Sequence, residues 1–232
     1  MEIKLKEKIG RLNRFYGDVY RSQNESIIAA ITGKSIIDIG CGYGFLVKQM
    51  MDTNRFNRVV GIDTDAESVA VAHNLHQGID IKKMDIFKMD FPDNCFETAI
   101  FRESIHHLNI DKALNAVKRI CSKEIIIFDP NPNFILRLSR KLINHKDDEV
   151  SLEILIEVLT KNNLKVNHYS YRDVIAFPLS GAMVGLEVCP DIRWLKKILI
   201  LIDKKINKLL NFLELQKYFC WRYIVKAEVR KV

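Results

Sequence analysis

The first 130 residues alternate short apolar runs with longer segments of helical periodicity, and each apolar run ends near Gly, Asp or Pro. This alternation is typical of βαβ units, in which crossover helices join parallel strands. We therefore predict a doubly wound α/β fold with a mainly parallel sheet. The predicted strands are Ser35–Ile39, Val59–Asp63, Ile79–Met84, Thr98–Arg102 and Glu124–Asp129, followed by Lys165–Tyr171 and a closing strand at Tyr218–Val229.

Helical periodicity and capping residues predict helices in the segments between and around these strands. Asp65, Asp111 and Ser151 are the predicted N-caps of three of the helices. The apolar segment Phe177–Val188 is interrupted by Gly and Pro, so it predicts a loop or lid instead of a helix. The predicted helices are one or two within Arg11–Ile31, then Leu46–Met51, Glu67–Leu75, Lys112–Ile120, Phe134–Leu142, Leu152–Lys161 and Trp194–Leu213.

The length of 232 residues predicts a single domain. Within it we expect an N-terminal helical segment at 1–33, followed by two halves at 34–130 and 131–232. The five cysteines are scattered without a C-x-x-C pair, which predicts neither a metal site nor disulfides and favours the reducing cytoplasm. The N-terminal segment lacks the apolar core of a signal peptide, and no apolar run is long enough to span a membrane.

The net charge of +7 is concentrated at the C-terminus. Residues 193–232 hold eleven Lys or Arg against three Asp or Glu, so the first 192 residues are close to neutral. An evenly basic nucleic-acid-binding protein would distribute its charge differently. The pattern therefore predicts no nucleic-acid partner, while a local basic patch remains able to attract phosphates or a membrane surface.

The segment IIDIGCGYGFL, residues 36–46, runs from a strand into three spaced glycines. A turn of this kind brings the backbone close to a nucleotide. The dinucleotide pattern G-x-G-x-x-G requires a third glycine where this chain has Phe45, or Val47 in the alternative register. The pattern here is D-x-G-x-G-x-G, and its Asp38 suits a ligand that carries an ammonium group better than one that carries a pyrophosphate.

A second acidic residue, Asp63, ends the next predicted strand, 23 residues after Gly40. A carboxylate at this place can accept hydrogen bonds from both ribose hydroxyls of a nucleoside. Nicotinamide dinucleotides and S-adenosylmethionine share that requirement. Asp63 therefore predicts a nucleoside ligand without choosing between the two, and a nicotinamide-dependent oxidoreductase stays open as an alternative.

At these motifs the chain resembles the class I S-adenosylmethionine-dependent methyltransferases, in particular the type 11 group, over about residues 30–130. The resemblance implies a Rossmann-like, seven-stranded fold with an antiparallel strand near the C-terminus. It also implies S-adenosyl-L-methionine as the cofactor. On this resemblance 34–130 is the cofactor-binding half, 131–232 is the acceptor-side half with the C-terminal basic amphipathic helix, and 1–33 is a helical cover. The cofactor-binding residues that the resemblance implies are Asp38, Gly40, Cys41, Gly42, Gly44, Asp63, Thr64, Asp85, Ile86 and Glu103.

The segment FPDNCFETAIFRESIHHL, residues 91–108, is similar to the family's stretch that enters and leaves the fourth strand, although Glu97 stands where aspartate is usual. His106 and His107 follow that strand and are the candidate catalytic residues. Two roles remain open for them: packing under the cofactor, or acting as a general base. No N/D-P-P-Y-like motif, which is frequent in enzymes that methylate exocyclic amines, follows the strand.

We expect a small-molecule acceptor that is at least partly hydrophobic, because the two candidate covers, around Phe15 to Tyr20 and within Phe177–Val188, are apolar. A lipid or quinone acceptor, a nucleic-acid acceptor and a non-catalytic adaptor are the competing hypotheses. On a helical wheel, residues 193–213 carry a basic side opposite an apolar side. This pattern is compatible with a packed helix and with peripheral membrane contact. It does not specify the oligomeric state or the acceptor atom.

Overall fold

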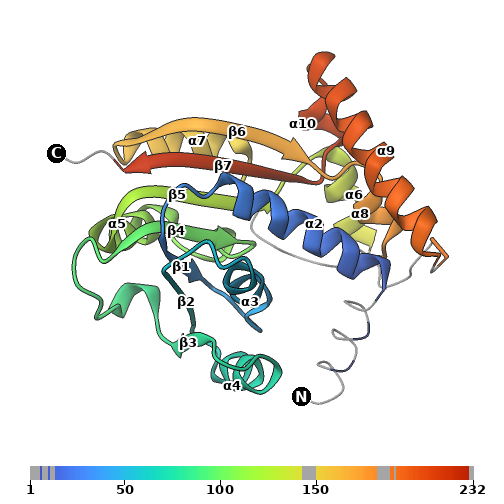
Figure 1. Cartoon of the computed structure of the whole chain (residues 1–232). Helices are drawn as coiled ribbons and strands as arrows, with labels where there is room; N and C mark the ends of the chain where they lie inside the picture. Colours follow the sequence, from blue (N-terminus) through green and yellow to red (C-terminus); the bar gives the residue numbers. More distant parts are fainter. Residues whose placement is uncertain are drawn as a thin grey trace. The chain divides into compact units, whose positions relative to one another are not determined.

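The computed structural model describes Lys6, Gly10 and residues 14–142, 150–181, 189–190 and 192–229. Its central feature is a seven-stranded sheet with the strand order β3-β2-β1-β4-β5-β7-β6. β1 to β5 pair in parallel, whereas β6 and β7 run antiparallel to each other (Figure 1). The strands are β1 Ser35–Ile39, β2 Arg58–Asp63, β3 Asp80–Lys83, β4 Phe96–Arg102, β5 Cys121–Pro130, β6 Leu164–Arg172 and β7 Arg222–Val229.

The α-helices alternate with the first strands and then dominate the C-terminal third of the chain. Short 3₁₀ helices follow β3 and β4, at Ile86–Lys88 (η1) and Ile105–His107 (η2). The α-helices are α2 Phe15–Ala30, α3 Phe45–Asp52, α4 Ala66–Leu75, α5 Ile110–Ile120, α6 Phe134–Leu142, α7 Leu152–Lys161, α8 Ala176–Leu179, α9 Arg193–Phe212 and α10 Gln216–Phe219. The doubly wound α/β fold with a C-terminal antiparallel pair is therefore confirmed.

The central strands are apolar on both faces because helices cover a parallel sheet on both sides. Four of the five residues of β1 are buried, and its neighbours β2 and β4 have similar runs of buried residues. Asp38 on β1 lies opposite Gly61 on β2 and Ile100 on β4. All five parallel strands end at the same edge of the sheet, so the residues that follow β1, β2, β3 and β4 come together there.

The chain forms two compact units. The larger unit comprises Ile27–Pro130, Asp147–Ser170 and Ile224–Val232, and its apolar core joins β1, β4 and β5 to α3 and α4. The smaller unit comprises Met1–Ser26, Asn131–Lys146 and Tyr171–Tyr223. Its core is an apolar cluster around Phe15, Phe177 and Trp221. The sequence-based division at 33 and 130 stays a prediction.

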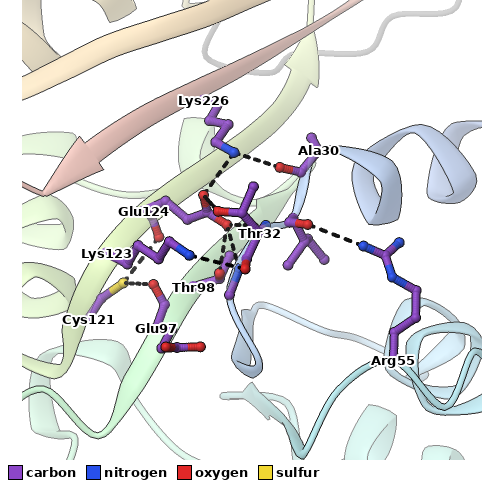
Figure 2. A network of polar contacts seen from close by, with 11 residues as sticks. Ala30, Thr32, Arg55, Glu97, Thr98, Cys121, Lys123, Glu124 and Lys226 are labelled. Carbon is purple, nitrogen blue, oxygen red and sulfur yellow. Dashed lines mark hydrogen bonds and ion pairs between the residues drawn. The ribbon is translucent and has the colours of Figure 1, made fainter.

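A polar network at the N-terminal edge of the sheet ties β5 to the chain segment that enters β1 (Figure 2). Glu124 of β5 is buried and accepts hydrogen bonds from the backbone N–H and the hydroxyl of Thr32, each at 2.7 Å. Thr98 donates a further hydrogen bond at 2.9 Å, and the ammonium group of Lys226 lies 2.9 Å away. The network is structural, because it lies at the edge opposite the glycine turn.

Three local predictions differ from the structure. Asn109, not Asp111, caps α5, because its side chain accepts the Lys112 N–H at 3.0 Å, whereas Asp111 is already inside the helix. The predicted closing strand starts at Arg222, since Gln216–Phe219 forms a helical turn. The predicted loop at Phe177–Val188 begins inside helix α8, and its residues 182–188 lie outside the described part of the chain.

Candidate active site

The glycine turn connects β1 to α3, and its backbone is held against β2. The N–H groups of Gly40 and Cys41 both donate to the carbonyl of Ile62, at 2.8 and 3.0 Å. Gly40 has a φ of 73°, and an added Cβ there would lie 2.7 Å from Ser104 Cβ. Glycine is therefore required at position 40 both by the left-handed conformation and by the close approach of the segment that follows β4.

Gly42 differs from Gly40 because the space beside its Cα is open. It has a φ of 53°, and a Cβ added there would meet no atom of the described residues within 4 Å. Its N–H donates to Asp63 Oδ2 at 2.8 Å. Glycine at position 42 thus leaves open space next to a backbone N–H group that is bound to the Asp63 carboxylate.

Asp38 lies under this turn and is almost fully buried. Its Oδ1 has no hydrogen-bond partner among the described residues. Burial raises the pKa of this carboxyl group to about 7; the nearby Arg102 opposes the rise and the carboxylate of Asp63 adds to it. A buried carboxyl oxygen without a donor is costly, and a cationic ligand group would offset that cost.

Asp63 ends β2 and is held by the backbone on both of its oxygens. Oδ2 accepts the Gly42 N–H, and Oδ1 accepts the Asp65 N–H at 2.9 Å. A carboxylate has about four acceptor sites, so further hydrogen bonds from a ligand are compatible with these two. Asp65 itself caps α4, as predicted, by accepting from the N–H groups of Glu67 and Ser68.

A cavity of about 310 Å³ opens beside Asp63 at the C-terminal edge of the sheet, entirely within the larger unit. Six of the predicted site residues line it: Gly40, Asp63, Thr64, Ile86, Glu103 and His107. Five further lining residues were missed by the predicted set: Ile39, Ile62, Met84, Ser104 and Leu108. Most of these directly flank predicted ones, so the position of each strand end was the signal that could have identified them.

The other predicted residues lie outside the lining of this cavity. Asp38 is buried under the turn, and Asp85 caps η1 by accepting the Phe87 N–H at 2.9 Å. Cys41 is half-buried, and burial, followed by the charges of Asp38 and Asp63, raises the pKa of its thiol. Cys41 is therefore a neutral thiol and not a nucleophile. Gly42 and Gly44 shape the turn, and Gly44 is the N-cap residue of α3.

The exit from β4 has a strained backbone. Glu103 adopts a φ of 52°, a conformation that non-glycine residues rarely occupy. Its N–H donates to the carbonyl of Phe128 at 2.7 Å, and the hydroxyl of Ser104 donates to the carbonyl of Ile39 at 2.7 Å. These two bonds hold Glu103 at the cavity, and such strain is common where a binding site constrains the chain.

His106 and His107 follow in η2 and have different surroundings. His107 is exposed and lines the cavity, whereas His106 is buried. The Nδ1 atom of His106 lies 2.8 Å from Asp129 Oδ1 and 3.0 Å from Oδ2, and the two imidazole rings are 4.0 Å apart between centroids. Because a carboxylate accepts, Nδ1 of His106 carries the hydrogen and Nε2 is the basic nitrogen of the ring.

Two polar residues after β5 have structural roles. Asn131 donates to the carbonyls of Lys217 and Cys220, and Asn133 donates to the same Cys220 carbonyl. Asn133 also accepts the Leu136 N–H at the start of α6. Likewise, Phe15 and Phe177 of the predicted covers are buried in the core of the smaller unit.

Comparison with known proteins gives matches to methyltransferases. A model described as "Methyltransferase domain" matches residues 37–145. The chain is 28% identical over 112 residues to a fatty-acid O-methyltransferase of Mycolicibacterium smegmatis, over 47% of this chain and 40% of that protein. It is 30% identical over 115 residues to a ubiquinone biosynthesis O-methyltransferase of Pasteurella multocida, over 49% of this chain and 43% of that protein. The chain thus spans about two fifths of the length of these curated relatives.

Among solved structures, geranyl diphosphate C-methyltransferase from Streptomyces coelicolor has a similar fold. That enzyme was crystallised with Mg²⁺, geranyl diphosphate and S-adenosyl-L-homocysteine. The match has a TM-score of 0.65 and 10% sequence identity, and it covers 93% of this chain and 82% of that chain. At this identity the similarity concerns the fold.

Proposed function

We propose that this chain transfers a methyl group to an oxygen atom of a small, largely apolar acceptor. The chain belongs to the class I S-adenosylmethionine-dependent methyltransferases by its domain family and its fold. Membership of this family favours methyl transfer over the nicotinamide-dependent oxidoreductase that the glycine turn had left open. The observation that carries the proposal is the pair of carboxylates at the glycine turn, the buried Asp38 and the cavity-facing Asp63.

The residues at the turn fit S-adenosylmethionine, the cofactor of this family. When bound, the cofactor supplies an electrophilic methyl group on a sulfonium. The unpartnered Oδ1 of Asp38 suits its ammonium group, and Asp63 suits its ribose hydroxyls. Ile86 and Met84 give the cavity an apolar wall suited to a purine. Of the remaining predicted residues, Gly40, Gly42 and Gly44 would shape the turn, and Thr64 and Glu103 would add polar contacts.

His106 is the proposed proton acceptor for the hydroxyl group that receives the methyl. Asp129 orients the imidazole so that Nε2 is the basic nitrogen. His107, which lines the cavity, is proposed to pack against the cofactor. Because methyl transfer from a sulfonium is an in-line displacement, the main task of the protein is to align the acceptor oxygen and exclude water.

The apolar character of the acceptor is supported by the similar proteins. The two curated relatives are named for a fatty acid and for ubiquinone biosynthesis, and the solved structure holds geranyl diphosphate. Each of these names concerns a molecule with a long hydrocarbon part. We propose an acceptor of that class for this chain, and we propose no nucleic-acid acceptor.

Helix α9 favours access to such an acceptor from a membrane surface. Its predicted packed side includes Ile198, Ile202 and Leu209, but the structure exposes 42%, 40% and 56% of these residues. Trp194, Leu201 and Phe212 are exposed on the same side. The packed side contains instead the buried Lys196 and Asp203. No helix among the described residues is long and apolar enough to cross a membrane, so we propose peripheral contact through residues 193–213.

Calorimetry with S-adenosylhomocysteine tests the cofactor site. Gly42→Val and Asp63→Ala are expected to weaken binding at least about tenfold, equivalent to about 1.4 kcal/mol. Gly78→Val is the matched control, because Gly78 has a φ of 74° and an added Cβ there would likewise meet no described atom within 4 Å, but Gly78 precedes β3 and lies outside the glycine turn. Undetectable binding to the unmodified chain would refute the proposal.

The acceptor class is tested with methyl-labelled S-adenosylmethionine and an extract of the native host cells. We expect the label to enter the organic-solvent fraction; label confined to the aqueous fraction would contradict an apolar acceptor.

Flotation with vesicles tests the membrane contact. Leu201→Ser with Phe212→Ser should abolish flotation, whereas Ile154→Ser, at an exposed position of α7, should not. If the unmodified chain does not float at any lipid composition, the membrane contact is excluded.

A further inference from the structure

A second and larger cavity lies within the smaller unit and has a volume of about 750 Å³. It is formed by the N-terminal part of α2 with the residue that precedes it, and by the N-terminal half of α9. None of its lining residues belongs to the cofactor cavity. The cationic residues that line it are Arg14, Arg21, Arg193, Lys196, Lys197 and Lys204.

The spacing of these residues shows that each helix presents one face to the cavity. Asp18, Arg21, Ser22 and Glu25 of α2 recur at intervals of three or four residues, as do the lining residues of α9 from Arg193 to Lys204. Other side chains of both helices enter the apolar cluster of the smaller unit: Phe15 and Val19 from α2, and Leu195 and Leu199 from α9. The apolar cluster therefore holds the two lining faces in place, of which the face of α9 is the basic one.

The charge in this cavity is strongly unbalanced. Six cationic side chains face two carboxylates, Asp18 and Glu25. Asp18 is already engaged by Lys196, whose ammonium group lies 3.3 Å from Asp18 Oδ2 and which is only 8% exposed. Cations gathered in a concave site repel one another and raise the local concentration of anions. The arrangement would gain free energy from a ligand that brings several negative charges.

We propose that this cavity, lined by α2 and α9, is a binding site for a multiply charged phosphate group such as a diphosphate. Three of the cationic side chains are arginines, whose planar guanidinium groups bind phosphate oxygens in pairs. The volume lies in the usual range of small-molecule sites, about 300–1,000 Å³, and leaves room for an organic group beyond the phosphates. The phosphate group can belong to a free metabolite or to a lipid headgroup.

Calorimetry with inorganic pyrophosphate on the full chain tests the site. The test variant is Lys197→Glu with Lys204→Glu, because both side chains line the cavity and both are exposed. The matched control is Lys205→Glu with Lys208→Glu, which makes the same change of charge on the same helix outside the cavity. We expect pyrophosphate binding that weakens at least about tenfold in the test variant and less than about twofold in the control.

A second arm distinguishes the two sources of phosphate. Vesicles that contain phosphatidylglycerol replace pyrophosphate, with the same two variants. The site is assigned to a lipid headgroup if only the test variant loses vesicle binding and the unmodified chain does not bind pyrophosphate. This outcome still supports a phosphate-binding site. Equal effects of the two variants on both probes, or no binding of either probe, overturn the site. Binding of S-adenosylhomocysteine, measured on every variant, reports separately on the cofactor cavity and on folding.

Discussion

His106 Nδ1 lies 2.8 Å from the carboxylate of Asp129, which joins the segment after β4 to the end of β5. Both residues are buried, and the imidazole of His106 lies against that of His107, which lines the cavity beside Asp63. The carboxylate selects one tautomer and one orientation of the ring, as expected for a proton acceptor. The same hydrogen bond would also stabilise the cavity wall. A test of His106 as a proton acceptor must therefore distinguish loss of proton transfer from loss of packing.

His106→Gln is expected to lower kcat by about 10²–10³, because a positioned base typically contributes this much. Asp129→Asn should lower kcat in the same direction, since the amide no longer selects the tautomer. The affinity for S-adenosylhomocysteine should change less than about twofold in both variants. His168→Gln, on the exposed part of β6, is the control. A proton NMR signal from Nδ1–H that persists in Asp129→Asn would contradict the pairing.

The affinity for S-adenosylhomocysteine should rise with pH because of Asp38. Burial raises the pKa of this carboxyl group to about 7, so it is mostly protonated at pH 6 and mostly ionised at pH 8. The ammonium group of the ligand requires the ionised form, which predicts about tenfold tighter binding at pH 8 than at pH 6. Asp38→Asn should bind more weakly at pH 8 and show little dependence on pH. An unchanged pH dependence in this variant would assign the effect to another group.

Without ligand, the same group should affect stability with the opposite trend. The pKa of Asp38 is higher in the folded chain than in the unfolded chain, so the folded state holds the proton more tightly. The free energy of unfolding should therefore fall as the pH rises from about 4 to about 7. Urea unfolding at several pH values measures this slope, which Asp38→Asn should reduce.

Glu124 should stabilise the fold in neutral solution and lose this effect in acid. Burial by itself would raise its pKa, but the hydrogen bonds from Thr32 and Thr98 and the ammonium group of Lys226 lower it to about 2. Its contribution is therefore complete above about pH 4.5 and is lost as the pH falls toward 2. Glu124→Gln should reduce the free energy of unfolding at pH 7 by about 2 kcal/mol, because the half-buried ammonium group of Lys226 keeps the Ala30 carbonyl but loses its carboxylate partner.

Glu228→Gln is the matched control for this prediction, because Glu228 is an exposed glutamate on the strand that carries Lys226. Chemical unfolding at pH 7 and at pH 3 should give a large difference between Glu124→Gln and the unmodified chain at pH 7 and a smaller one at pH 3. If Glu228→Gln is as destabilising as Glu124→Gln, the network in Figure 2 does not make the contribution assigned to it.

Local patterns in the sequence predicted the strands and helices of residues 34–130. β1 matches its predicted bounds, and the other parallel strands differ from theirs by a few residues at their ends. Such strands are recognisable because they are apolar throughout and end at turn residues. The shared edge where these strands end follows from parallel pairing, so Gly40, Asp63 and Glu103 could be placed at one site before any coordinates were known.

Only the tertiary structure decided which partners these residues have. Asp129 and His106 are 23 residues apart in sequence, and nothing in either segment indicates that they pair. Asp38 is buried under the turn, and its Oδ1 has no hydrogen-bond partner in the part of the chain that the structure describes. The pattern of α9 showed two sides but not which of them faces the protein, because periodicity records that a helix is amphipathic and burial depends on what packs against it.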